Sequence, residues 1–229
     1  MQFETLNQGS SPLVASRNKV LRNTYALLGL SMIPTVLGAI VGVKMGFATL
    51  FAGSPMLSLL LFFGVAFGFI FAIERFKTSS IGVALLLGFT FFMGLMLSRI
   101  LTWTLGFSNG GSLIALACAG TGAIFLCMAG VATVTKRDLS GMGKFLFVGV
   151  IIALVASVAN VFLHLPALTI VVSILCLGIF SAYIMYDVNR VVTGGETNYI
   201  SATLAIYLDV YNVFVSLLQI LGIFGGNRD

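Results

Sequence analysis

The chain has 229 residues, of which 59% are hydrophobic and only 8% are charged. A soluble domain has about a quarter charged residues, so this composition excludes a soluble enzyme. The 12 Lys and Arg residues outnumber the 7 Asp and Glu residues, but they are scattered along the chain and form no basic patch for nucleic acid. We therefore predict an integral membrane protein that is embedded in the lipid bilayer and has no nucleic-acid partner.

A polar N-terminal segment precedes seven long apolar stretches. Residues 1–23 are predicted to form a flexible cytoplasmic tail, and residues 24–229 a single transmembrane domain. Each stretch has about 20 residues, enough for a helix rising 1.5 Å per residue to cross about 30 Å of hydrocarbon. The predicted spans are 24–43, 55–73, 80–101, 111–133, 144–164, 167–189 and 200–224. The fold class is therefore an all-α integral membrane protein with a bundle of seven transmembrane helices.

The short polar segments carry Lys and Arg mainly on one side of the predicted membrane. A cytoplasmic N-terminus agrees with the excess of positive residues found in cytoplasmic loops and places the C-terminus in the periplasm. The alternative is a re-entrant last stretch, which would return Arg228 to the cytoplasm. Only Lys44, Arg99 and Arg228 lie on the outer side, whereas the inner side carries Arg17, Lys19, Arg22, Arg75, Lys77, Lys136, Arg137, Lys144 and Arg190.

Two glycine pairs are spaced for close contacts between helices. Gly38 and Gly42 form a G-x-x-x-G motif in the first stretch, as do Gly64 and Gly68 in the second. Such pairs allow helix backbones to approach closely in lipid. This spacing favours a helix bundle and says nothing about function.

Three cysteines, Cys118, Cys127 and Cys176, lie inside apolar stretches without C-x-x-C spacing. This pattern indicates small buried side chains rather than a disulfide framework or a zinc site. The chain also has no phosphate loop and no nucleotide motif. We therefore expect neither a resident metal nor a cofactor.

Polar residues fall on one helical face in three of the apolar stretches. In the last stretch this face carries Asp209, Asn212, Ser216 and Gln219, at spacings that match the helical repeat. The fifth stretch presents Asn160 in the same way, and the sixth ends with Asp187. Because lipid does not tolerate such faces, they are predicted to face one another or a wet cavity. Asn212, Ser216 and Asn160 are candidates for a polar pathway, and the alternative is that they join helices by hydrogen bonds.

Asp209 and Asp187 are the leading candidates for a functional site. A carboxylate in mid-span costs about 2.5–3.5 kcal/mol on insertion scales and is a functional candidate by default. The two stretches are joined by a short loop, so both acids enter the membrane from the same side and are expected to meet. Two carboxylates about 5 Å apart repel by about 3 kcal/mol at an effective dielectric near 20, so such a pair would share one proton. Arg75 is expected to reach this pair, and the alternative for Arg75 is an anchor at the membrane surface.

Several segments together resemble the transmembrane Bax-inhibitor-motif family and its bacterial YccA branch. The resemblance covers nearly the whole chain from residue 19 onward. It rests on VLRNTY at 20–25, DLS at 138–140, YD at 186–187, GGETNYI at 194–200 and LDVYNVF at 208–214.

This resemblance implies a seven-helix fold with the last helix at the centre. It also implies a di-aspartyl pH sensor at Asp187 and Asp209, engaged by a basic residue that matches Arg75. The family is associated with a pH-dependent calcium leak, and its YccA branch with binding and restraining the membrane protease FtsH in the bacterial inner membrane.

We therefore consider two functions. The first is a proton-gated cation leak that transports calcium, and the second is a regulatory partner of FtsH that transports nothing. A third reading, an intramembrane aspartyl protease, has one matching element in Tyr186–Asp187. The second element, Gly-x-Gly-Asp, is absent because Asp209 follows Tyr207 and Leu208. We therefore expect no enzymatic activity. The sequence indicates no oligomeric state.

Overall fold

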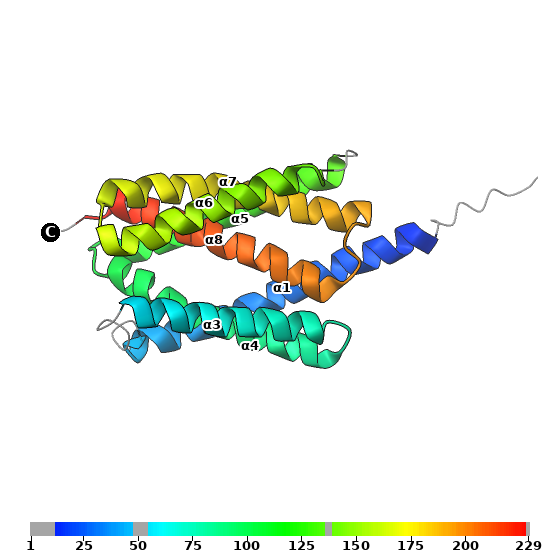
Figure 1. The fold of residues 1–229 in the computed structure, drawn as a ribbon, viewed down its shortest axis with the longest axis horizontal. Helices are drawn as coiled ribbons and strands as arrows, with labels where there is room; N and C mark the ends of the chain where they lie inside the picture. Colours follow the sequence, from blue (N-terminus) through cyan, green and yellow to red (C-terminus); the bar gives the residue numbers. More distant parts are fainter. Residues whose placement is uncertain (1–11, 48–54, 136–138, 228–229) are drawn as a thin grey trace, which may run out of the picture.

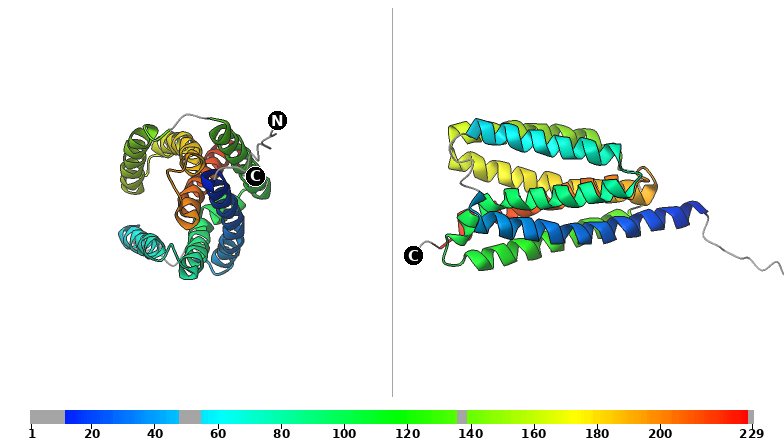
Figure 2. Two further views of the ribbon diagram at one scale, coloured as in Figure 1. Left: turned by 90° about the vertical axis from the view of Figure 1, so that its right-hand side faces the viewer. Right: turned by 90° about the horizontal axis from the view of Figure 1, so that it is seen from below.

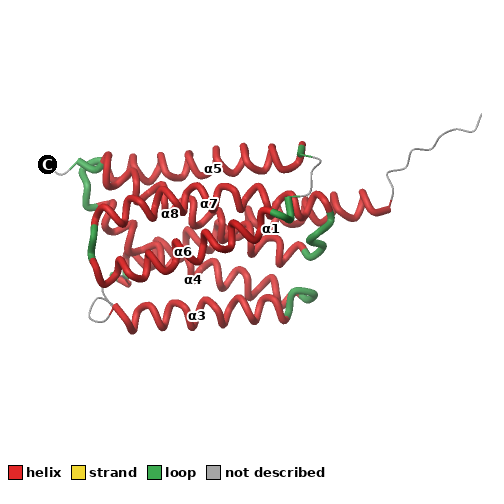
Figure 3. The backbone as a smooth tube through the Cα atoms, turned by 45° about the horizontal axis from the view of Figure 1, so that its top comes forward, coloured by secondary structure: helices red, strands yellow, loops and turns green. Residues whose placement is uncertain are grey.

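The computed structural model is all-helical across the residues it describes, which are 12–47, 55–135 and 139–227. Short loops join long helices, and no strand occurs in these ranges (Figure 3). All seven helices are long and apolar enough to cross a membrane, so the chain is a multi-pass membrane protein and the predicted fold class is confirmed. The helices are α1 (Pro12–Lys44), α3 (Pro55–Arg75), α4 (Ser80–Leu105), α5 (Gly110–Val134), α6 (Met142–Leu163), α7 (Pro166–Thr193) and α8 (Tyr199–Gly225).

The first helix is longer than predicted. It begins at Pro12 rather than at residue 24, and Figure 1 shows it extending beyond the other helices at that end. Residues 13–23 contain neither glycine nor proline, so nothing in this polar segment interrupts a helix. The predicted tail boundary is therefore wrong for residues 12–23, whereas residues 1–11 lie outside the described part of the chain.

The last helix lies at the centre of the bundle. It packs against α1, α4, α5 and α7, whereas α6 packs mainly against α7 and α3 mainly against α4. The end-on view in Figure 2 shows α3 and α6 at the outer edge. Ile206, Val213 and Leu218 of α8 are completely buried. The position that the family resemblance implies for the last helix is confirmed.

Helix α8 crosses the whole bundle and is held at both ends. At its start, the Asn198 amide donates to the Lys77 carbonyl at 2.9 Å. At its end, the Asn109 amide donates to the Gly225 carbonyl at 2.7 Å. Since Lys77 and Asn109 flank opposite ends of α4, α8 spans the same thickness as α4. The start of α1 and the end of α8 therefore lie at opposite ends of the bundle (Figure 1), and α8 does not turn back within it.

The two glycine pairs have different surroundings. A Cβ atom at Gly38 would collide with the backbone carbonyl of Phe91, and one at Gly42 would lie 2.8 Å from the Ser98 Cβ. The first pair therefore allows close packing of α1 against α4. A Cβ at Gly64 or Gly68 would meet no other described atom within 4 Å, so the second pair makes no such contact.

Candidate functional site

A tight reversal between α7 and α8 brings their polar faces together. Gly194 ends α7 with a φ of 86°, a left-handed conformation that glycine adopts without strain. Asn198 then caps α8, because its side-chain oxygen accepts hydrogen bonds from the Ile200 and Ser201 amides. The two helices are therefore antiparallel neighbours, and the end of α7 faces the first half of α8.

The structure brings the two predicted acids into contact. Asp187 is 8% exposed and Asp209 is 5% exposed, and their side chains are within hydrogen-bonding reach of each other. The Oδ2 atom of Asp209 is buried and has no hydrogen-bond donor among the described residues. Two ionised carboxylates are both acceptors, so a hydrogen bond between them requires a proton on one of them. The geometry is that of a pair that can share one proton.

The cation beside this pair is Arg190, one helical turn beyond Asp187. Its Nη1 atom lies 3.4 Å from Asp187 Oδ1, and its Nη2 atom lies 3.7 Å from Glu196 Oε2. The guanidinium also lies over the Tyr186 ring, 5.7 Å from the centroid. Sequence reasoning missed Arg190, although the spacing of three residues from Asp187 is the signal that predicts such a contact on a helix.

Arg75 is not part of the site in this structure. It is exposed at the end of α3, and it forms no ion pair with either aspartate within the described ranges. Its neighbour Glu74 binds Lys77 at 2.9 Å, and this hydrogen bond and charge raise the pKa of the Lys77 ammonium. Arg75 is kept away because α3 packs mainly against α4, at the edge of the bundle. The expected contact between Arg75 and the acids is therefore not formed.

The polar face of α8 meets α7 again farther along. Ser173 of α7 donates to Gln219 Oε1 of α8 at 2.7 Å, so the predicted facing of these two polar faces is confirmed. Between Asp209 and Gln219, Ser216 is 3% exposed. The Asn212 amide donates to the Leu208 carbonyl of its own helix at 2.8 Å, which leaves its side-chain oxygen as an acceptor.

Asn160 has a different place from the one predicted. Its amide donates to Thr169 Oγ1 at 2.6 Å, and its oxygen accepts from the Leu165 amide at 3.0 Å. These bonds close the turn between α6 and α7, where His164 has a left-handed φ of 52°. The side chain therefore joins two helices, as the alternative held, and does not line a route with the α8 residues.

No ready-made metal site is present in the described ranges. No three His, Cys, Asp or Glu side chains gather closely enough there to hold a metal ion. Cys118 and Cys127 are exposed on the outside of the helices, Cys176 is partly buried, and all three are free thiols.

Comparison with known sequences extends over almost the whole chain. The family described as "Inhibitor of apoptosis-promoting Bax1" matches residues 17–226. The "Modulator of FtsH protease YccA" of Escherichia coli K12 is 38% identical over 207 residues, which cover 90% of this chain and 91% of the relative. The protein of E. coli O6:H1 with the same identity and coverage is called "Inner membrane protein YccA". An uncharacterized protein of Neisseria meningitidis serogroup B is 40% identical, with the same coverage of both chains.

Proposed function

Because the chain belongs to the Bax1-I family of inhibitors of apoptosis-promoting Bax1, we propose that it is a proton-gated cation leak with Asp187 and Asp209 as its switch. The transported ion in this proposal is calcium. One observation carries the proposal, namely the contact between two buried carboxyl groups from neighbouring helices. The proposal includes an inner-membrane location with a cytoplasmic N-terminus, which is supported by the name of a relative and by the distribution of Lys and Arg.

The switch works through the loss of the shared proton. With the proton present, a hydrogen bond joins α7 to α8 through Asp187 and Asp209. Without it, two carboxylates about 5 Å apart repel by about 3 kcal/mol at an effective dielectric near 20. That energy changes a two-state equilibrium by about a hundredfold. Protonation can therefore select between two arrangements of these helices.

Arg190 decides which acid carries the proton in this proposal. Its guanidinium lies 3.4 Å from Asp187, so negative charge is favoured on Asp187. Asp209 is more deeply buried and has no cation beside it within the described residues, so the proton stays on Asp209. The ionic contact from Arg190 to Glu196 also connects the pair to the loop between α7 and α8.

The polar route of this leak runs along the face of α8 that meets α7. From Asp209 it passes Asn212 and Ser216, at successive turns of the helix, and reaches Gln219. The α7 side of this route contributes Ser173, which binds Gln219. Asn160 has no part in it, because both ends of its amide are used in the turn between α6 and α7.

Calcium flux in proteoliposomes tests the switch. We expect wild-type flux to differ between measurements at about pH 6 and about pH 8, because a coupled pair of acids changes charge with pH, and Asp209→Asn to remove this dependence. Glu74→Gln is the matched control, since it neutralises an acid that is paired with Lys77 near the surface. A flux that responds to pH equally in wild type and Asp209→Asn would remove the sensor role from the pair. Absence of flux in the folded wild-type protein would contradict the leak itself.

A second candidate function is modulation of the membrane protease FtsH. The observation that favours it is the name of the E. coli relative, a modulator of that protease. Residues 1–11 precede α1, and a chain terminus is the kind of segment that a protease engages most readily. We expect deletion of residues 2–11 to abolish restraint of FtsH and to leave calcium flux intact. Restraint that survives this deletion contradicts the role of the terminus, and restraint that is lost in Asp209→Asn would tie both functions to the acid pair.

A further inference from the structure

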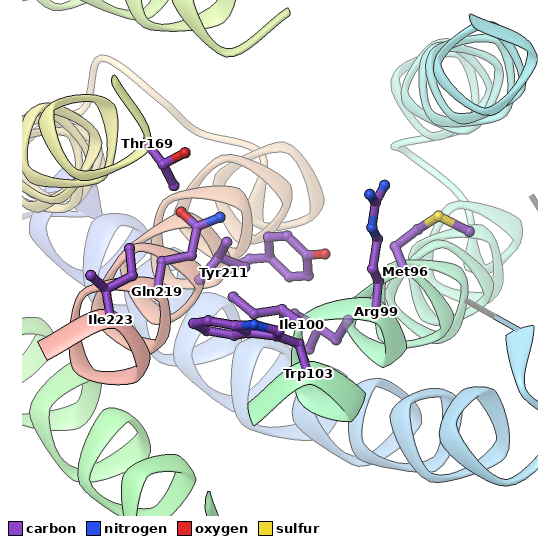
Figure 4. A pocket seen from close by; sticks show the side chains of 10 residues that line it. Met96, Arg99, Ile100, Trp103, Thr169, Tyr211, Gln219 and Ile223 are labelled. Carbon is purple, nitrogen blue, oxygen red and sulfur yellow. The ribbon is translucent and has the colours of Figure 1, made fainter. Parts of the chain in front are cut away.

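The end of the bundle opposite the acid pair contains a cavity that the proposed switch does not use. Its volume is about 410 Å³, and it lies where α4 ends, α7 begins and α8 ends (Figure 4). This volume is in the range of about 300–1,000 Å³ that is typical of small-molecule sites. The walls are largely apolar, and the side chains include Met96, Ile100, Val215 and Ile223.

Arg99 supplies a positive charge to this cavity. It belongs to α4, six residues before the helix ends at Leu105, or about 9 Å along the axis at 1.5 Å per residue. Its side chain is exposed and extends from α4 alongside the cavity (Figure 4). No acidic residue in the described ranges forms an ion pair with it. An arginine this close to the end of a span can place its charge in the headgroup region of the membrane.

The other polar groups of the cavity are available mainly as donors. Gln219 uses its oxygen to accept from Ser173, so its amide hydrogens remain free to donate. The Trp103 indole contributes a further N–H group, and its ring lies along the floor of the cavity near Arg99 (Figure 4). Among the described residues, none that lines the cavity carries a carboxylate. The cavity therefore offers donors from Arg99, Gln219 and Trp103, the first of which is positively charged, beside apolar walls. This combination fits a ligand that has an anionic head and a hydrocarbon chain.

We propose that this cavity binds an anionic phospholipid from the membrane leaflet at this end of the bundle. The headgroup phosphate accepts hydrogen bonds from Arg99, whose planar guanidinium suits two phosphate oxygens at once. One acyl chain lies in the cavity against Trp103, Ile100 and Ile223. The site does not include the acid pair, and it shares only Gln219 with the proposed polar route.

Trp103 makes the proposal directly measurable because it is the only tryptophan in the chain. The protein is placed in nanodiscs of phosphatidylcholine that contain equal mole fractions of either brominated phosphatidylglycerol or brominated phosphatidylcholine. Bromine quenches tryptophan fluorescence on contact. We expect brominated phosphatidylglycerol to bind about tenfold more tightly, as for one charge-assisted contact, and the preference to fall to about one in Arg99→Gln.

Two variants separate this site from general attraction to an anionic surface. Lys44→Gln removes a positive charge at the same end of the bundle, at the last residue of α1, and should keep the wild-type preference. Arg99→Lys keeps the charge without the planar guanidinium and should keep part of the preference. A preference retained in Arg99→Gln, or lost equally in Lys44→Gln, would overturn the proposal.

The wild-type measurement alone also decides the question if Arg99→Gln does not fold. Equal quenching by the two brominated lipids would overturn the proposal. Inorganic phosphate is added separately to wild-type protein in phosphatidylcholine nanodiscs without bromine. A saturable change in Trp103 emission there would assign the site to free phosphate instead of phospholipid, whereas no change supports the lipid.

Discussion

The two halves of α8 differ in how completely the bundle encloses them. In the first half, buried side chains lie all around the helix and include Tyr207 and Asp209. The second half is buried only at Val213, Ser216, Leu218 and Gly222, and Phe224 near its end is 70% exposed. The first half is surrounded by protein. The second half has one buried side and forms a wall of the cavity that Arg99 borders.

This difference shows how burial determines whether a charged side chain requires a bound proton or a partner of opposite charge. Asp209 is only 5% exposed, so its charge must be removed by a proton or balanced by a partner. Arg99, next to the second half, lies in an open cavity and keeps its charge without an acidic partner within the described ranges. One half of the helix is therefore suited to respond to protons, and the other to receive a ligand from the membrane.

The largest effect is expected from a larger side chain at Gly222, where the second half of α8 packs closely against Trp103. A Cβ atom at Gly222 would lie 2.6 Å from the Trp103 ring atom Cη2, so Gly222→Leu forces the indole away from α8. We expect a loss of about 3 kcal/mol, the upper end for overpacking, in unfolding measured in detergent, together with a shift of Trp103 emission. Gly178→Leu on α7 is the control, because a Cβ there meets no described atom within 4 Å. Equal stability of the two variants would contradict the close packing of Trp103.

A smaller effect is expected from the cap that starts the first half. Asn198→Ala removes hydrogen bonds to two α8 amides and one to the Lys77 carbonyl. We expect it to lower the unfolding free energy by about 1–2 kcal/mol, as for other helix caps. Ser79 begins α4 without a side-chain capping bond, so Ser79→Ala should change stability by less than about 0.5 kcal/mol. If the two variants were equally stable, Asn198 would not hold the start of α8.

The smallest effect is expected from one hydrogen bond inside the first half. The Tyr207 hydroxyl and Thr35 Oγ1 form a hydrogen bond of 2.9 Å, and Thr35 Oγ1 also lies 2.8 Å from the Ser31 carbonyl oxygen. Tyr207→Phe should therefore lower the unfolding free energy by about 1 kcal/mol. Tyr25 packs its ring edge against Phe125, so Tyr25→Phe is the control and should have little effect. A Thr35→Val and Tyr207→Phe double-mutant cycle with no coupling energy would show that this bond does not stabilise the bundle.

Much of the fold could be predicted from composition and helical period. Runs of apolar residues located seven spans, because a helix must satisfy its own backbone in lipid. The start of α1 was misplaced by twelve residues, because hydrophobicity marks where a helix enters lipid and not where it begins. The spacing of the glycine motifs favoured close helix packing in general, but it could not show that Gly38 and Gly42 contact α4 while Gly64 and Gly68 face no neighbouring helix.

The candidate site was only partly predictable. Asp187 and Asp209 could be paired because a short loop and similar depth restrict where two acids on consecutive helices can lie. The cation could not be chosen in this way, because Arg75 and Arg190 lie near the same membrane side and only packing separates them. Arg190 is held one turn from Asp187 on the same helix, whereas Arg75 lies at the end of α3, which packs mainly against α4.

The sequence by itself determined that the chain lies in a membrane and how many times it crosses. It also determined which acidic side chains are so costly to place in the membrane that a functional role is expected. These properties follow from the transfer of single segments from water to lipid, a cost that depends on each segment alone. Tertiary structure decided that α8 is enclosed by its neighbours, that Arg190 is the cation at the acid pair, and that Arg99 borders a cavity. Those properties depend on which helices are in contact. Lipid does not select these contacts, because several arrangements of equally apolar helices are compatible with the same bilayer.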